Sequence, residues 1–436
     1  MPSSPVTPAT RNDAGADRSI RTFLALVALV FVVGSRLLWS SPEYRQQHLL
    51  LASLLALLAF RAVCWPVLRR SGWPGVVFGA GLLAAHAASW VGGVRHGVAP
   101  LAATAAALQG LLGVAGLVVL VTVLLEARWH RYAKWTAFTV LTLLAVGSFG
   151  GYFISIERYI QLGGYANFYE PLRLALIWPT RLLTVSFGQI AWDHTNYAAY
   201  YFALSFALIL ESLAAGVGGR RWLRWGWCGL LCAGVFLTAS RGGGLMVALA
   251  LPLILIGRPP RFAAATIVTR VVAIGCGYGG LMAKIAMLPT EPAKPPPTTA
   301  LHGSDYVKRA SSGRTSVYRQ IWQDLEGSRC CGMGLAATGE PVLYLNQEHS
   351  SYMATLRGGG LLALAGHALV LAAAAWSAWL LLRRGVRWPA VLLVAALGGL
   401  MFDRSTVIAL TGNYEFLSHW VAVLIPLLLA SERSGL

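Results

Sequence analysis

The feature that most constrains this chain is an alternation of long apolar segments with short clusters of basic residues. Stretches such as FLALVALVFVVGS and HLLLASLLALLAF are apolar over lengths approaching the roughly 20 residues that a helix needs to cross a bilayer. Between neighbouring clusters the chain has room to cross twice, and positive residues stay on the cytoplasmic side of a membrane. The clusters are Arg11/Arg18/Arg21, Arg69/Arg70, Arg128/Arg131/Lys134, Arg220/Arg221/Arg224, Arg258/Arg261 and Arg383/Arg384/Arg387. This pattern predicts a helical protein with many membrane spans.

Composition argues against a soluble protein. Of the 436 residues, 56% are hydrophobic and 12% charged, with a mean hydropathy of +0.61, so there is too little polar material to cover a soluble surface. The net charge of +18 is spread over short loops and not over a basic module interleaved with aromatic residues. We therefore expect no nucleic-acid partner.

We expect an all-α, polytopic membrane protein, with one multi-pass domain over residues 1–436 and about 12 transmembrane helices. An even number of spans puts both termini in the cytoplasm. The predicted extents are 20–40, 47–67, 74–93, 99–126, 134–154, 194–215, 222–239, 242–257, 263–286, 352–381, 388–409 and 414–431.

Two outward segments are too long to be simple connections. Residues 155–193 mix aromatic and charged residues and are predicted to form an interfacial segment at headgroup depth. Residues 287–350 form a large outer loop that opens with the proline-rich LPTEPAKPPPTT. Within it, Val317, Ile321 and Leu325 recur at a spacing of four, which predicts a short amphipathic helix.

The six cysteines have no metal-ligand spacing. Four fall in predicted spans, where we expect small buried hydrophobic side chains; they are Cys64, Cys228, Cys232 and Cys276. Adjacent Cys330 and Cys331 are predicted to face outward as two unpaired thiols rather than as a strained vicinal disulfide.

Arg241 is the first candidate functional residue, in FLTASRGGGLMVALA between two spans. A charge at mid-membrane costs roughly 2.5–3.5 kcal/mol, and less near the interface. The tight SRGGG hairpin favours a functional role over an arginine that snorkels to headgroups. The glycines that follow permit a tight re-entry and a close approach of a ligand to the backbone.

Arg314 begins the predicted amphipathic helix, and Arg319 lies five residues later on another face. Either is also consistent with a solvated loop charge. Asp324 and Glu326 form a D-x-E pair, which we interpret as the polar face of this helix and not as a metal site. The sequence has no D-x-D, H-E-x-x-H or phosphate-loop motif, which disfavours an enzyme that uses a nucleotide.

His349 lies where the outer loop enters a span, in LNQEHSSYMATLRGGG. An imidazole with a pKa near 6.5 is suited to accept a proton at neutral pH, although an interfacial histidine with a local hydrogen bond fits the same position. His194 and Asn196 occupy another outward helix entrance, where capping or orienting roles are as reasonable as contact with substrate.

Three motifs occur in a fixed order: TASRGGG after a mid-chain span, SGRTSVYRQIWQDL followed by GMG, and HSSYMATLRGGG at the start of the next span. In this order and with this predicted sidedness they resemble the O-antigen ligase/polymerase family of bacterial inner-membrane proteins, the Wzy-C type. The resemblance covers about residues 190–370. Ser350 stands where the family commonly has Asn, Met353 where it has Leu, and Ala363 where it has Gly.

The resemblance implies a GT-C-type glycosyltransferase that is inverting, independent of metal ions and free of cofactors. Arg241 and Arg314 would bind a diphosphate, and His349 would be the catalytic base. The implied donor is O-antigen on undecaprenyl diphosphate and the implied acceptor is the lipid A-core oligosaccharide, at the periplasmic face of the inner membrane.

Several alternative functions remain open, both inside this family and outside it. The span number and the single large outer loop favour the ligase branch of the family over a chain-lengthening polymerase or a protein O-oligosaccharyltransferase. A transporter or flippase for lipid-linked glycans is the alternative from another class. Transporters show related halves, whereas this sequence has no visible internal repeat.

Overall fold

The structure is a computed structural model that describes residues 69, 71–126, 195–216, 220–237, 240–286, 314–334, 350–401 and 417–433. Helices and no strands occur in this part of the chain. The predicted spans 20–40, 47–67 and 134–154 and the segment 155–193 lie outside the described residues, as does most of the loop 287–350.

The helices that overlap predicted spans begin within a few residues of them, and all but α15 also end within a few residues; residues 402–409 of the predicted span 388–409 lie outside the described residues. The bounds are α4 Trp73–Arg95, α5 Pro100–Glu126, α8 Thr195–Ala214, α9 Arg221–Leu237, α10 Arg241–Leu255, α11 Pro260–Ala286, α13 Arg314–Asp324, α14 Ser351–Arg383, α15 Trp388–Leu400 and α16 Leu417–Arg433. The amphipathic helix predicted in the outer loop is confirmed as α13.

Two of the described helices, α4 and α14, are long and apolar enough to cross a membrane. Shorter apolar stretches run through Phe202–Ala214, Gly242–Leu255, Trp388–Leu400 and Trp420–Ala430. Together these support an all-helical, membrane-associated chain.

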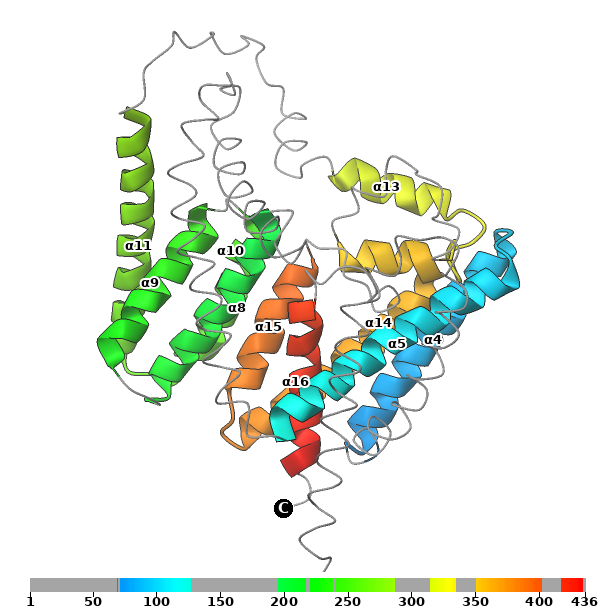
Figure 1. The fold of residues 1–436 in the computed structure, drawn as a ribbon, viewed down its shortest axis with the longest axis horizontal. Helices are drawn as coiled ribbons and strands as arrows, with labels where there is room; N and C mark the ends of the chain where they lie inside the picture. The colour runs from blue at the N-terminus through cyan, green and yellow to red at the C-terminus, as the bar shows by residue number, and fades with distance from the viewer. Residues whose placement is uncertain are drawn as a thin grey trace, which may run out of the picture.

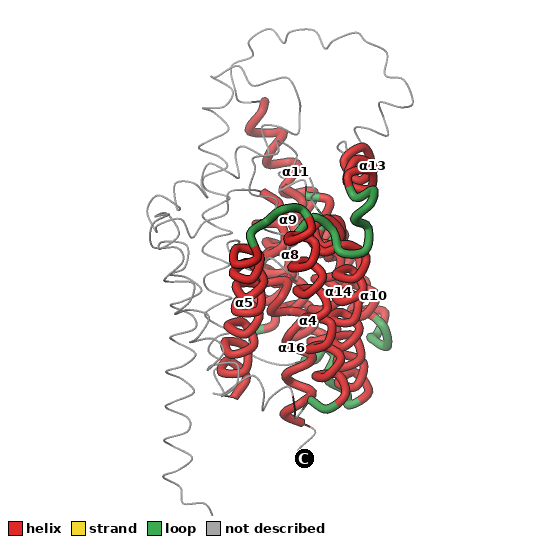
Figure 2. Tube along the Cα trace, turned by 90° about the vertical axis from the view of Figure 1, so that its right-hand side faces the viewer, coloured by secondary structure: helices red, strands yellow, loops and turns green. Residues whose placement is uncertain are grey.

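The described helices form two packed groups that meet along α15 and α16 (Figure 1). One core joins α4, α5, α14 and α16, with Phe78, Leu117 and Trp420 among its most buried side chains. The other joins α8, α9, α10, α11 and α15 around Phe202 and Met246. Figure 2 shows these helices running side by side, with α13 lying beyond one end of the bundle on a short connecting loop.

Small residues let α4 and α14 pack very closely. A Cβ atom added at Gly81 would lie 2.5 Å from the carbonyl oxygen of Gly366, and one added at Gly366 would lie 2.9 Å from the backbone nitrogen of Ala85. Side chains larger than glycine would therefore push the two backbones apart. Such contacts between small residues are a common way for membrane helices to associate.

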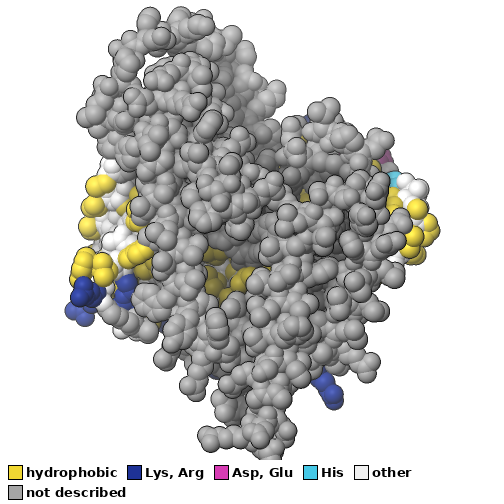
Figure 3. All heavy atoms as spheres, in the orientation of Figure 1, with side chains coloured by type: hydrophobic (Ala, Val, Ile, Leu, Met, Phe, Trp, Pro, Cys, Tyr) yellow, Lys and Arg dark blue, Asp and Glu magenta, His cyan; other side chains and the backbone are white. Residues whose placement is uncertain are grey.

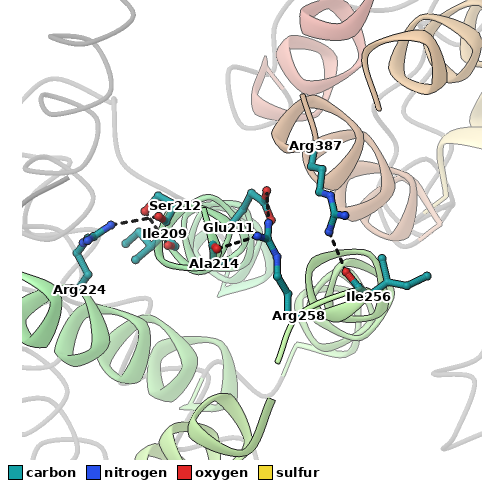
Figure 4. A network of polar contacts seen from close by, with 8 residues as sticks. All are labelled: Ile209, Glu211, Ser212, Ala214, Arg224, Ile256, Arg258 and Arg387. Atoms are coloured by element: carbon teal, nitrogen blue, oxygen red, sulfur yellow. Dashed lines mark hydrogen bonds and ion pairs between the residues drawn. The ribbon is translucent and has the colours of Figure 1, made fainter. Parts of the chain in front are cut away.

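Arginine side chains bond helix ends together at one end of the bundle. At this end, which we call the basic end, α8, α10 and α14 finish and α9, α11 and α15 begin. Arg258 donates to the carbonyl of Ala214 at 2.7 Å and pairs with Glu211 at 3.2 Å (Figure 4). Arg387 donates to the carbonyl of Ile256 at 2.8 Å. Carbonyls at helix C-termini lack intrahelical partners and attract cations, so these contacts stabilise the ends of α8 and α10.

The cysteine predictions hold in part. Cys228 and Cys232 are buried, and Cys64 lies outside the described residues. Cys276 is exposed, so its predicted burial is wrong. The period of α11 explains this, because Cys276 lies four residues after the exposed Val272 and on the same side of the helix. Cys330 and Cys331 are free thiols, as predicted, although Cys331 is buried and does not face outward.

Candidate functional site

The candidate residues lie at helix starts on one end of the bundle, opposite the basic end (Figure 1). Arg241 is the first residue of α10, Arg314 the first of α13 and Asn196 the second of α8; for these three the structure describes the backbone position. His194 and His349 lie outside the described residues. Ser350, which follows His349 in the chain, is the residue that precedes the first turn of α14.

The first of the three motifs, TASRGGG, contains the capped start of α10. The side chain of Ser240 accepts a hydrogen bond from the backbone nitrogen of Gly243 at 3.2 Å, which fixes the first turn of α10. A Cβ atom at Gly243 would lie 2.7 Å from the Cβ of Ala199 on α8. The starts of α8 and α10, with Asn196 and Arg241, are therefore close neighbours, and Gly243 is required for that approach.

Helix α13 packs its apolar face on the start of α14. Ile321 and Leu325 are buried against Leu356, with Val317 and Met353 partly buried beside them. These are the apolar positions that the spacing of four predicted. The packing holds Arg314, the start of α13, over the same end of the bundle as the start of α14.

Helix α14 is broken at Gly360, where φ is 65° and ψ is −162°. This backbone conformation is essentially restricted to glycine. An unbroken helix would have the backbone nitrogens of Leu361 and Leu362 donate to the carbonyls of Arg357 and Gly358. The break leaves all four groups without those partners.

A loop from the end of α13, residues 328–334, supplies the missing partners, and we call it the inserted loop. The nitrogens of Leu361 and Leu362 donate to the carbonyls of Arg329 (2.8 Å) and Cys330 (3.0 Å). In the reverse direction the nitrogens of Met333 and Gly334 donate to the carbonyls of Arg357 and Gly358, both at 2.9 Å. Four bonds between loop and helix thus replace two bonds within the helix, so the buried backbone stays satisfied.

Glycines on three segments make room for the inserted loop. Gly332, at φ 66°, would carry a Cβ atom 2.5 Å from the nitrogen of Gly360. A Cβ atom at Gly92 of α4 would lie 2.7 Å from the carbonyl oxygen of Gly332. Gly334, at φ 82°, contacts Gly93 in the same way. The loop backbone is therefore wedged between α4 and the break in α14, which ties α13 and the first turns of α14 into one unit.

A buried polar contact links the two halves of α14. Thr355, before the break, lies 3.0 Å from the Nδ1 atom of His367, after it. The ring of His367 also contacts those of Tyr352 and Trp420, at centroid distances of 5.6 and 5.7 Å. His367 is fully buried, and a buried polar contact of this kind fixes the angle between the two halves.

Sequence reasoning missed two of the buried polar residues in this region, Arg357 and His367. Arg357 is 7% exposed, and burying a guanidinium is costly unless it is bonded. A signal was present, because the string Arg-Gly-Gly-Gly occurs both at Arg241 and at Arg357. The first copy opens a helix and the second spans the break.

The remaining candidates on α13 have separate surroundings. Arg319 is exposed. Asp324 accepts a hydrogen bond from Gln320 at 2.7 Å, and Glu326 lies 4.0 Å from Arg329. Within the described residues, no group of three or more His, Cys, Asp or Glu side chains is arranged to hold a metal ion.

In comparisons with known proteins, no family model, no curated protein and no solved structure matches the chain. The family resemblance consequently rests on the three motifs and their order.

Proposed function

We propose that the protein is an O-antigen ligase, a glycosyltransferase that moves O-antigen from undecaprenyl diphosphate to the lipid A-core oligosaccharide. One observation carries the proposal. The three motifs that resemble the family stand at the starts of α10, α13 and α14, which lie at one end of the bundle, and the inserted loop joins the last two. This placement puts motifs that are far apart in sequence at the same end of the bundle, which supports a shared substrate.

The donor diphosphate matches the charge at this end. As the glycosidic bond breaks, negative charge grows on the phosphate oxygens of the leaving group. Arg241 and Arg314 stay ionised and can bond phosphate oxygens bidentately. Each also opens a helix, where the positive end of the dipole favours an anion. Two arginines fixed in this way would stabilise the transition state without a metal ion.

The acceptor requires a base on the other side of the anomeric carbon. His349 lies two residues before the start of α14, whose first turns are held by α13 and the inserted loop. In the proposed reaction it removes the proton from an acceptor hydroxyl, which attacks the anomeric carbon as the diphosphate leaves. A single displacement of this kind inverts the configuration.

A lipid-linked donor and a lipid-linked acceptor both require a membrane protein. The length and apolar composition of α4 and α14 support this setting. The proposal includes about 12 spans, both termini in the cytoplasm and a periplasmic site in the inner membrane. The concentration of arginines at the end opposite the candidate residues supports that orientation.

Purified protein incubated with lipid-linked O-antigen and lipid A-core tests the proposed reaction. We expect a ladder of O-antigen on the lipid A-core, formed in detergent micelles and in the presence of EDTA. Longer lipid-linked chains without transfer to the core would instead identify a polymerase. Product that forms only when the protein separates two sealed compartments would indicate a transporter.

A further inference from the structure

One face of α11 is apolar and exposed along the helix. The exposed fractions are 58%, 59%, 64% and 55% for Ile267, Val268, Val271 and Val272. The opposite side, with Phe262 and Ala273, is buried against the bundle. No described element covers the exposed face.

Arg261 stands at the end of that same face. Val268 and Val272 follow it by 7 and 11 residues, which are close to two and three full turns of an α-helix. Arg261 is exposed and lies in the first turn of α11. The apolar face therefore ends in a cation at the basic end of the bundle.

The neighbouring helix α9 adds a second cation and an aromatic ring beside Arg261. We call this part of the basic end, where α9 and α11 begin, the corner. Trp225 of α9 contacts Phe262 of α11, with ring centroids 5.5 Å apart. Arg221 and Trp222 lie one turn before Trp225, and both are exposed, Trp222 at 66%. In Figure 3 basic side chains gather at the left-hand edge, at the position of α9 and α11, with hydrophobic side chains above them.

The positive charge of this corner has no carboxylate beside it in the described sequence. Neither α9 nor α11 has an acidic residue in its first turn, and both helices start here, so their dipoles add to the positive potential. Of the acidic residues at the basic end, Glu211 is paired with Arg258, whereas Glu126 and Glu432 lie at the ends of α5 and α16 in the other packed group. By contrast, Arg383 lies in the last turn of α14 and stacks over Trp379 at 5.0 Å, where the dipole already favours a cation.

We propose that this corner binds one anionic glycerophospholipid. Its phosphate lies between Arg221 and Arg261, Trp222 sits at headgroup depth, and the acyl chains follow the apolar face of α11. Guanidinium groups suit a phosphodiester, tryptophan suits the membrane interface, and basic residues attract anionic lipid at the cytoplasmic surface. The proposal rests on the membrane setting of the proposed function but not on its transfer reaction.

Lipid competition on the purified full-length chain tests this site. Binding of phosphatidylglycerol and of phosphatidylcholine with identical acyl chains is measured by native mass spectrometry. The variants are Arg221→Gln with Arg261→Gln and, as a matched control that removes the same charge at the same end, Arg383→Gln with Arg384→Gln. We expect the wild type to prefer phosphatidylglycerol, the first double variant to lose about 25-fold of that preference, and the control to lose less than about twofold.

Single Arg221→Gln and Arg261→Gln variants, each expected to lose about fivefold, keep the test decisive if the double variant does not fold. Equal binding of the two lipids by the wild type, or equal losses in the two double variants, would overturn the proposal. So would displacement of phosphatidylglycerol by inorganic phosphate alone, because that would identify a site for free phosphate. None of these readouts depends on glycosyl transfer.

Discussion

At the scale of single residues, glycines decide whether the inserted loop can enter the break in α14. Gly92 is the clearest case, because the atoms that a Cβ would meet there belong to the backbone of Cys331 and Gly332, which cannot rotate away. Gly79, on the same helix, has nothing within 4 Å of the same position. Alanine substitutions at Gly92 and at Gly79 therefore distinguish the loss of this close contact from the general effect of adding a methyl group to α4.

We expect Gly92→Ala to lower the free energy of unfolding by about 1–3 kcal/mol through overpacking. Gly79→Ala should leave stability unchanged or raise it by up to about 1 kcal/mol, because alanine is the better helix former. Unfolding in mixed micelles measures both variants. Equal effects of the two substitutions would show that the loop does not depend on the contact at Gly92.

The sequence predicted the positions of the candidate residues better than their surroundings. Arg241 and Arg314 open helices close to the expected boundaries, since apolar length and flanking charge mark where spans end. The roles of Arg357 and His367 were missed, because both sit inside an apolar run where only the partner segments reveal them. His367 meets Thr355 only once the helix has broken between them.

At the scale of elements, α14 is two half-helices held in register by a segment from another part of the chain. The sequence predicted one continuous span over 352–381. The break requires both the glycine conformation at Gly360 and the backbone of residues 329–334. Propensity and periodicity are local, so they cannot show which distant loop will satisfy four backbone groups.

Hydrogen exchange tests the inserted loop directly. We expect the backbone amides of Met333, Gly334, Leu361 and Leu362 to exchange as slowly as amides inside the helices, because each donates at 2.8–3.0 Å. In Gly92→Ala these amides should lose protection together. If peptides that cover 329–334 in the wild type exchange at the rate of an unstructured chain, the loop is not inserted.

The ion pair at the basic end also acts between elements, since Glu211 lies in the last turn of α8 and Arg258 follows α10. Glu211→Leu leaves a largely buried guanidinium without its carboxylate, and we expect a loss of about 3 kcal/mol in unfolding free energy. The double variant Glu211→Leu with Arg258→Met should be more stable than the single one. If the double variant loses as much unfolding free energy as the two single variants added together, the two side chains are not coupled.

At the scale of the whole molecule, charge divides the two ends of the bundle. Arginines gather where α8, α10 and α14 end, and the candidate residues stand where these helices begin. The sequence predicted this division from the rhythm of basic clusters. Nine described helices overlap predicted spans, and α4 and α14 among them are long and apolar enough to cross a membrane. The packing into two groups was not predicted, because each span is apolar enough to fit beside several others.

Thiol labelling tests the orientation of the bundle. In a cysteine-free background, Ala99→Cys lies at the end with the candidate residues and Arg384→Cys at the basic end, and both positions are exposed. A membrane-impermeant maleimide added to spheroplasts should label Ala99→Cys at once and Arg384→Cys only after lysis. The reverse order would put the candidate residues in the cytoplasm and contradict a periplasmic site.

The most direct test of the account is the rate at which lipid-linked O-antigen is transferred to lipid A-core by the wild type and by His349→Ala, with Arg384→Gln as a control for expression and folding. We expect the wild type and the control to form product at similar rates. His349→Ala should still bind the donor and be slower by about 10²–10⁴-fold, the usual contribution of a general base. Transfer by His349→Ala at the wild-type rate would contradict the role of His349 as the base, and no transfer by the wild type would contradict the proposed function.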